Sequence, residues 1–258
     1  MRDGHIHSPY CPHGTKDSFE EYITSAIKKG LKEMTFTEHL SLPNNFKDPS
    51  PKQDSAMSEE FILDYFNDVK NLKEKYKNEI KINIGVEVDF IEGYEEEIKE
   101  SLNKYGKYLD DAILSVHMIK IEDKYYCIDF SVDEFGKITD LLGSLEDVYK
   151  KYYETVKLAI NSDLGEFKPK RIGHLNLVRK FNQAFPFDYE NNEILEEIVK
   201  LIKQKKYELD FNVSGNRYEY SKEPYIHGYL LDLINKYSIE YVYGSDSHSA
   251  KYVGKFEV

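Results

Sequence analysis

Short apolar or β-branched runs alternate with longer amphipathic segments along the whole chain. This alternation predicts βα units and a mostly parallel sheet. The seven predicted strands cover residues 3–6, 34–36, 81–88, 112–116, 171–173, 208–213 and 240–243. The predicted helices cover residues 19–29, 59–76 after an N-cap at Ser58, 92–105, 145–160, 192–205 and 224–236. Each strand except the last is thus followed by a helix.

The segment 40–57 lies outside this alternation, because it is rich in Pro, Asn, Ser and Asp. A loop of this length inside a compact domain commonly covers or binds something, and we expect it to lie over one face of the sheet. No linker, internal repeat or low-complexity tail interrupts the pattern. We therefore expect a single domain over residues 1–258.

Composition and charge narrow the possible partners. The formal net charge of −12 disfavours a nucleic-acid partner, and the basic stretch 168–171 is too short to form a binding stripe. No apolar run reaches the roughly 18 residues of a membrane span, and the first residues lack the apolar core of a secretory signal. With only Cys11 and Cys127, a disulfide framework is implausible, so we expect a cytoplasmic protein.

The positions of the histidines predict a functional site in addition to the fold. Seven of the eight lie at or just after the end of a predicted strand, where parallel strands bring catalytic groups together. Two carboxylates, Glu87 and Asp246, share this placement. The seven histidines are His5, His7, His13, His39, His117, His174 and His248.

Imidazole and carboxylate together suit divalent zinc, iron or manganese, and nine such ligands are too many for one ion. The sequence therefore predicts a site for two to three divalent metal ions. In the pairs His5 and His7, and Asp246 and His248, one intervening residue lets both side chains of an extended backbone face the same side. Any one of these histidines alone would more often be an ordinary surface or core residue.

Four further residues could belong to the metal site. His227 begins a predicted helix, and we leave it out of the metal set. Cys11 could ligate a metal as a thiolate, but we favour a spacer role beside His13. Glu38 and Asp89 could orient neighbouring ligands, or they could be solvated carboxylates; both interpretations stay open.

These residues resemble the motifs of the polymerase and histidinol phosphatase (PHP) superfamily of metal-dependent phosphoesterases, over nearly the full length of the chain. The N-terminal His-x-His motif matches His5 and His7, and a later motif matches 245–248. The opening segment 2–14 and the segment 48–57 look like the histidinol-phosphate phosphatase branch. Glu38 stands where many members carry aspartate, which leaves the ligand set intact.

The resemblance implies an α/β fold, a distorted (β/α)7 barrel of parallel strands with a trinuclear metal site at its C-terminal face. It implies one ion on His5, His7, Glu87 and Asp246, with Glu87 bridging to a second. The second ion would lie on His117 and His174, and the third on His13, His39 and His248.

The resemblance also implies the substrate, L-histidinol phosphate of histidine biosynthesis. The predicted chemistry is attack of a metal-bridging hydroxide on phosphorus, with Glu87 and Asp246 counted among the catalytic residues and no covalent phosphoenzyme. Arg217 and Arg179 follow strands on the same expected face, and we predict that they bind the phosphate.

Three alternatives remain open. A phosphoesterase of the same architecture could act on phosphotyrosine, a nucleotide or a nucleic-acid end, because the metal site does not select the leaving group. A non-catalytic module would need missing ligands. A sugar-barrel or amidohydrolase-like enzyme also begins with His-x-His, but the additional His13, His39 and His248 argue against it. The oligomeric state is not predicted.

Overall fold

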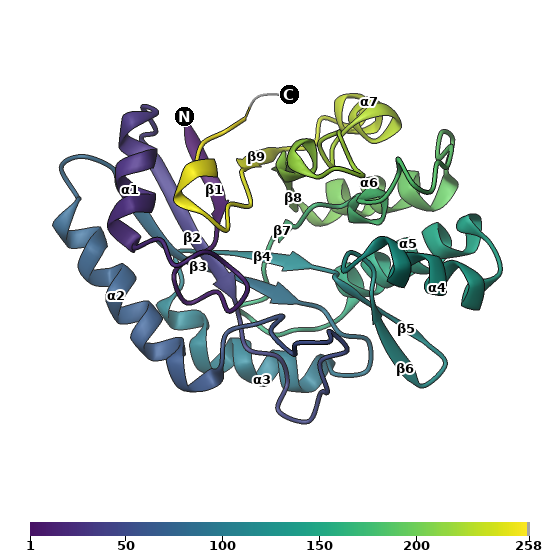
Figure 1. Ribbon diagram of the computed structural model, residues 1–258, viewed down its shortest axis with the longest axis horizontal. Coiled ribbons are helices and arrows are strands. Elements are labelled where there is room, and N and C mark those ends of the chain that lie inside the picture. The colour runs from purple at the N-terminus through teal and green to yellow at the C-terminus, as the bar shows by residue number, and fades with distance from the viewer. Residues whose placement is uncertain (257–258) are drawn as a thin grey trace.

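Seven parallel strands form one sheet that curls toward a barrel (Figure 1). The computed structural model describes residues 1–256. The strands are hydrogen-bonded in the order β1-β2-β3-β4-β7-β8-β9. They are β1 Arg2–Ile6, β2 Glu33–His39, β3 Lys81–Asp89, β4 Asp111–Ser115, β7 Arg171–Ile172, β8 Glu208–Asn212 and β9 Tyr241–Gly244. The seven predicted strands and the (β/α)7 barrel are thereby confirmed.

Backbone hydrogen bonds join the two edge strands of the described chain at their carboxyl ends. There Ile6 bridges to Ser247, the backbone N–H of Asp246 donates to the carbonyl of His5 at 2.8 Å, and that of His7 donates to the carbonyl of Ser247 at 3.0 Å. The barrel is therefore closed by the same short segments that carry His5, His7 and Asp246.

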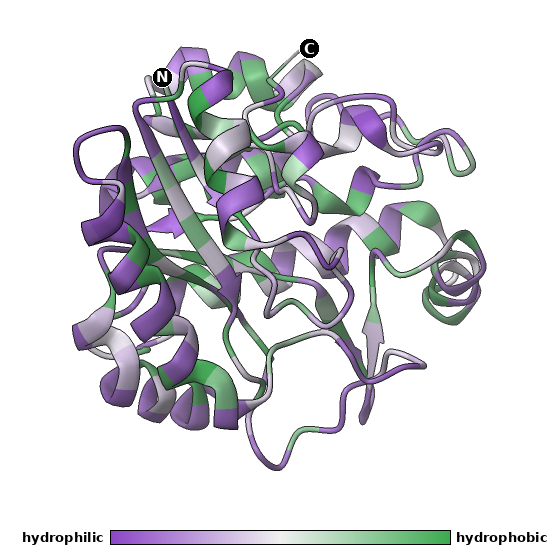
Figure 2. Ribbon diagram, turned by 60° about the vertical axis from the view of Figure 1, so that its left-hand side comes forward, coloured by the Kyte–Doolittle hydropathy of each residue, from purple (hydrophilic) through white to green (hydrophobic). Residues whose placement is uncertain are grey.

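The helices pack around this sheet with their apolar faces inward. Figure 1 shows α1 to α3 to the left of and below the strands and α4 to α7 to the right, and Figure 2 shows hydrophobic and hydrophilic stripes alternating around the helices. The helices are α1 Phe19–Lys28, α2 Ile62–Lys75, α3 Glu95–Tyr105, α4 Val132–Leu142, α5 Leu145–Asn161, α6 Glu193–Lys205 and α7 Gly228–Tyr237. None of these helices has the length and apolar run that crossing a membrane requires.

The inside of the barrel is polar rather than apolar. On β3 the alternating Ile82, Ile84, Val86 and Val88 are buried toward the helices, whereas Glu87 is buried on the opposite face. The other polar side chains that are at most 5% exposed on the strands are Asp3, His5, Thr35, Thr37, Glu38, His39, Asn83, Asp89, Ser115, Arg171, Asp210 and Asn212. The apolar core consequently lies between strands and helices, while the barrel interior is free for charged groups.

One region differs from the prediction. Between β4 and α5, where only irregular chain was expected, the structure has an antiparallel hairpin of β5 Met118–Ile121 and β6 Lys124–Cys127, followed by α4. The hairpin turn has a left-handed residue, Glu122 (φ 53°), instead of the glycine that would mark such a turn in sequence. Helix α4 is N-capped by Ser131, whose side chain accepts from Glu134 N.

Three helix starts also differ. Helix α2 is preceded by a 3-10 turn at Glu59–Phe61, and Ser58 makes no capping hydrogen bond. Helix α3 starts at Glu95 because Gly93 has a φ of 91° that no helix contains. Helix α7 starts at Gly228, because Tyr225 and Ile226 are buried and the N–H of Tyr225 donates to the carbonyl of Asn212 instead.

The bottom of the barrel holds a buried ion cluster that yields a test of the fold. Asp111 accepts hydrogen bonds from both Arg2 and Arg171, and Arg171 is only 1% exposed. We expect Asp111→Ala to lower the free energy of unfolding by about 3 kcal/mol, because it leaves a buried guanidinium without its charge partner. Chemical denaturation measures this. Asp140→Ala, an exposed control on α4, should change it by less than about 0.5 kcal/mol; equal effects of the two variants would contradict the assignment.

Candidate metal centre

The carboxylate of Glu87, on β3, lies at the middle of the predicted set. Its Oε2 atom is 3.2 Å from His5 Nε2, 3.5 Å from His7 Nε2 and 3.3 Å from His39 Nδ1. These three histidines come from β1, the segment after it, and the end of β2. One oxygen of Glu87 thus faces three imidazoles from neighbouring strands.

The other oxygen of Glu87 faces two more histidines. Oε1 is 3.0 Å from His174 Nε2 and 3.7 Å from His117 Nε2, and the two Nε2 atoms are 3.1 Å apart. Ser115, at the end of β4, donates its hydroxyl to the same oxygen at 2.5 Å. Glu87 therefore lies between two groups of histidines, one on each carboxylate oxygen.

Asp246 closes the first group from the opposite edge of the sheet. Its Oδ1 is 3.2 Å from His7 Nε2 and 3.6 Å from His5 Nε2, while Oδ2 accepts from Ser214 at 3.0 Å and from Asn212 at 3.2 Å. Asp246 has a φ of 48°, a left-handed backbone conformation that costs energy in a non-glycine residue. This backbone turn directs the carboxylate toward β1.

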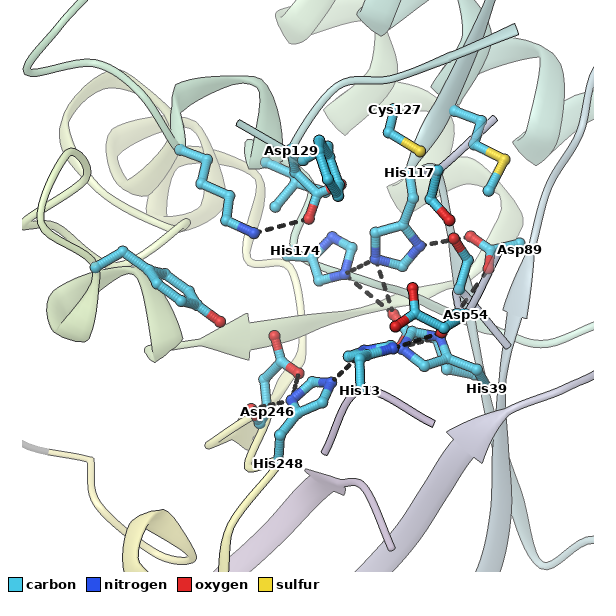
Figure 3. Close-up of a pocket in the computed structure, with 18 of the residues that line it drawn as sticks. His13, His39, Asp54, Asp89, His117, Cys127, Asp129, His174, Asp246 and His248 are labelled. Atoms are coloured by element: carbon cyan, nitrogen blue, oxygen red, sulfur yellow. Dashed lines mark hydrogen bonds and ion pairs between the residues drawn. The ribbon is translucent and has the colours of Figure 1, made fainter. Parts of the chain in front are cut away.

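His13 and His248 form a further pair near the first group. Their Nε2 atoms are 3.0 Å apart, and His248 Nδ1 is 3.6 Å from Asp246 Oδ1. The ring of His39 is centred 5.3 Å from that of His13 and 6.0 Å from that of His248. All nine predicted ligands are therefore brought together at the carboxyl ends of the strands. Figure 3 shows His13, His39, His117, His174, Asp246 and His248 of this set.

Most of the histidines contact a carboxylate or a backbone carbonyl through the ring nitrogen that faces away from Glu87. His5 Nδ1 is 2.7 Å from Asp210 Oδ2, and His13 Nδ1 is 2.7 Å from the backbone carbonyl of Asp54. Asp89 lies 2.5 Å from His117 Nδ1, and Glu38 lies 3.5 Å from His7 Nδ1. Carboxylates at this position commonly orient metal-binding histidines, so the structure favours the orienting interpretation of Glu38 and Asp89.

This arrangement fits divalent metal ions. Since a carbonyl can only accept, His13 Nδ1 carries a proton, and so does His248 Nδ1, which donates to the carbonyl of Asp246 at 3.2 Å. Their Nε2 atoms therefore face each other at 3.0 Å, an arrangement that either a shared proton or a metal ion stabilises. His7 Nε2 and His39 Nδ1 are also buried without a hydrogen-bond partner among the described residues. Such unsatisfied nitrogen atoms are ready to ligate a metal.

The electrostatics of the centre are strongly coupled. Burial raises the pKa of Glu87, but His5, His39 and His117 hold it well below its usual range. Burial lowers the pKa of His7, but the nearby carboxylates of Asp246 and Glu38 raise it to about 9. In the same way burial lowers the pKa of His117, whereas Asp89 and Glu87 raise it to about 10. The carboxylates consequently stay ionised and demand positive charge from protons or metal ions.

A cavity of about 450 Å³ opens onto this centre. Its wall includes residues from the loop 40–57, which confirms that this loop covers the expected face. Phe46 anchors the loop, with its ring centred 5.2 Å from that of Tyr94 and 4.9 Å from that of Tyr125. The cavity is also lined by residues that are not predicted ligands. They are Ser50, Lys52, Asp54, Ser55, Asp89, Met118, Cys127, Asp129, Phe130, Leu177, Lys180, Tyr218 and Tyr225.

The two predicted phosphate-binding arginines do not line this cavity. Arg179 pairs with Glu223 through its Nε and donates to the carbonyl of Phe187 at 3.1 Å. Arg217 donates to the backbone carbonyls of Ser245 and Asp246 at 2.9 and 3.2 Å. Their role in phosphate binding stays a prediction, and in the structure Arg217 stabilises the chain segment that carries Asp246.

The structure also places the residues that the sequence analysis left out of the site or did not identify. His227 caps α7 outside the cavity, with its side chain 53% exposed. Cys11 is a buried free thiol whose sulfur lies with His13 and His248 in a potential metal-binding group. Asp210 was missed, although the alternation of polar residues along β8 indicates that one face of that strand is unusual. Lys180 was also missed, although Arg179 beside it was predicted to bind phosphate after the same strand.

Comparisons with known proteins find similarity over nearly the whole chain. The model of the PHP domain matches residues 3–214. The histidinol-phosphatase of Bacillus subtilis (strain 168) is 42% identical over 257 residues, which cover 98% of this chain and 95% of that protein. The histidinol-phosphatase of Lactococcus lactis is 27% identical, with 96% and 84% covered.

Two solved structures are also similar. One, from Listeria monocytogenes and provisionally described as a histidinol phosphatase, is 35% identical with a TM-score of 0.95, covering 99% of this chain and 98% of that one. The other is the Lactococcus lactis histidinol phosphate phosphatase complexed with zinc, L-histidinol and phosphate. It is 21% identical with a TM-score of 0.67, covering 96% and 86%, and supports the fold alone.

Metal binding should release protons at pH 7. In the metal-free protein His7 and His117 have pKa values of about 9 and about 10, so both are protonated at pH 7, whereas a metal ligand must be neutral. Metal affinity should accordingly rise with pH until the pH passes these values. Isothermal titration calorimetry in buffers of different ionisation enthalpy measures the proton release.

Asp89→Asn is the matched variant, because Asp89 raises the pKa of His117 and is not itself in the predicted ligand set. This variant should release fewer protons per ion than the wild type. A binding enthalpy that is independent of the buffer, or an equal proton release from both proteins, would contradict the electrostatic description.

Proposed function

The chain belongs to the PHP domain family, and from this premise we propose that it is a metal-dependent phosphatase that hydrolyses L-histidinol phosphate to L-histidinol and phosphate. The observation that carries the proposal is the Glu87 carboxylate, which faces five histidine nitrogens within 3.7 Å at the base of the cavity. The 42% identity with the Bacillus histidinol-phosphatase supports the choice of substrate.

We assign three ions to the nine residues. The first would lie between His5, His7, Glu87 and Asp246, and Glu87 would bridge to a second. His117 and His174 would complete the second, since their Nε2 atoms are 3.1 Å apart and both face Glu87 Oε1. The third would lie between His13, His39 and His248. Imidazole with carboxylate is a donor set for zinc, iron or manganese.

When bound, such ions neutralise phosphoryl oxygens and acidify water. The protein itself supplies orientation: Asp210 holds His5 in place, and Asn212 and Ser214 hold Asp246. On the cavity wall, Lys180 supplies positive charge. Tyr225 supplies a hydroxyl that lies near Ser214 without a regular hydrogen bond, and burial raises its pKa, so that it remains a donor.

The proposal also covers the domain organisation, the cellular location and the size of the substrate. We propose that residues 1–258 act as one domain, in the cytoplasm, on a small phosphate ester rather than on nucleic acid. The net charge of −12 supports the last point, because the protein would repel a polyphosphate backbone. A single small cavity beside the metal ligands suits a metabolite better than a polymer.

The direct test is phosphate release from L-histidinol phosphate, compared with p-nitrophenyl phosphate, a nucleoside monophosphate and phosphotyrosine. We expect kcat/KM to be highest for L-histidinol phosphate and to be lost on chelation. We also expect His39→Ala to lower kcat/KM at least about 100-fold, because it removes a nitrogen that faces Glu87.

His227→Ala is the matched control, since it removes the one histidine outside the predicted site. It should keep wild-type activity. If another ester in the panel is the better substrate, the substrate assignment is wrong while the metal chemistry stands. If chelation leaves the activity unchanged, the whole proposal is wrong.

A further inference from the structure

A charged pair faces the cavity without belonging to the metal ligands. Lys180 Nζ donates to Asp129 Oδ2 at 2.8 Å, and the two side chains are 17% and 22% exposed. Lys180 also lies over the ring of Tyr218, 4.7 Å from its centre. Figure 3 shows Asp129 beside His174 and His117, on the wall above the centre. Both charges are therefore within the cavity but apart from the nine ligands.

The fold brings Asp129 to this position through the hairpin. The backbone N–H of Ile128 donates to the carbonyl of His117 at 2.9 Å, so the chain leaves the hairpin beside the residue where it entered. Lys180 arrives from the loop after β7, next to the turn at Leu177–Arg179. Two loops that each follow a histidine-bearing strand end thus contribute one charge each.

This pair is not explained by stability. Removing two charges from water costs energy that a single hydrogen bond hardly repays, so an isolated buried ion pair contributes little. In the described part of the chain Asp129 accepts its hydrogen bond from Lys180 at Oδ2 alone, which leaves Oδ1 free for a ligand. Asp89 and Asp246, in contrast, are occupied by His117 and by His7.

The proposed substrate has complementary charges. L-histidinol phosphate carries an anionic phosphate and a cationic amine on adjacent carbon atoms. A phosphate at the metal ligands would lie near Lys180, because Lys180 lines the same cavity as Asp246 and His174. An amine one carbon further on needs a carboxylate on the same wall, and Asp129 is the partly buried carboxylate that lies beside Lys180 there.

We propose that Asp129 binds the ammonium group of the substrate and thereby selects phosphate esters with an amine next to the ester carbon. Lys180 is a positioning residue, which holds the Asp129 carboxylate and directs its remaining N–H groups toward the phosphate. This inference rests on the proposed function and adds the specificity-determining residue to it. Asp54 also lines the cavity, but among the described residues no ion pair holds its carboxylate in place, whereas Lys180 holds that of Asp129.

The test compares L-histidinol phosphate with its analogue without the amine, 3-(imidazol-4-yl)propyl phosphate. The wild type should prefer the amine by about 10- to 100-fold in kcat/KM, as expected for a hydrogen bond between charged groups. Asp129→Asn should remove most of this preference through KM, and should change kcat/KM for the amine-free ester less than about threefold. Asp123→Asn, at the exposed turn of the same hairpin, should behave as wild type.

Metal content, measured by elemental analysis, should be the same in the three proteins. The inference is overturned if Asp129→Asn keeps the preference for the amine-bearing ester or loses activity toward both esters equally. It is also overturned if this variant binds fewer metal ions than the wild type. If the wild type hydrolyses neither imidazole ester better than p-nitrophenyl phosphate, the proposed function fails separately. In that case the wild type and Asp129→Asn are compared on 2-aminoethyl phosphate and ethyl phosphate, which also differ by the amine. An equal loss of activity toward both esters again overturns the inference.

Discussion

The carboxylate of Glu87 is shared by imidazoles from both sides, and this interaction determines the arrangement of the rest of the site. A buried carboxylate is costly unless positive charge or hydrogen-bond donors surround it. Here five histidine nitrogens and the Ser115 hydroxyl lie within 3.7 Å of its two oxygens. In the proposed centre the same two oxygens would bridge two ions, so one side chain links the ligand groups of four strands.

The barrel makes this possible because its interior is polar. Small apolar side chains would fill a barrel of this size, whereas here ion pairs occupy the bottom and histidines with carboxylates occupy the top. Gly244 illustrates how tightly the layers fit: a Cβ atom there would lie 2.1 Å from Asp210 Oδ1 and 2.7 Å from His5 Cβ. The absence of that side chain lets Asp210 reach His5, and hydrogen bonds between the first and last strands then hold His5 beside Asp246.

Sequence predicted much of this, for a physical reason. Residues at the carboxyl ends of parallel strands converge whatever the details of packing, so the nine residues could be recognised from their positions alone. The orienting groups depend on which face of a strand points inward. The alternation along β8 marks a polar face but does not show that this face points toward the histidines, and Asp210 was therefore missed. Asp129 depends on the hairpin, whose turn has no glycine. Arg179 was predicted to bind phosphate, but Glu223 and Phe187 hold its guanidinium away from the cavity wall.

The bridging role of Glu87 is the central claim, and anomalous X-ray diffraction from crystals of the metal-loaded protein tests it most directly. We predict one metal peak at each oxygen of Glu87, at about 2.0–2.2 Å. The peak at Oε2 should lie among His5, His7 and Asp246, and the peak at Oε1 between His117 and His174. Metal peaks confined to His13 and His248, with none in contact with Glu87, would contradict the account.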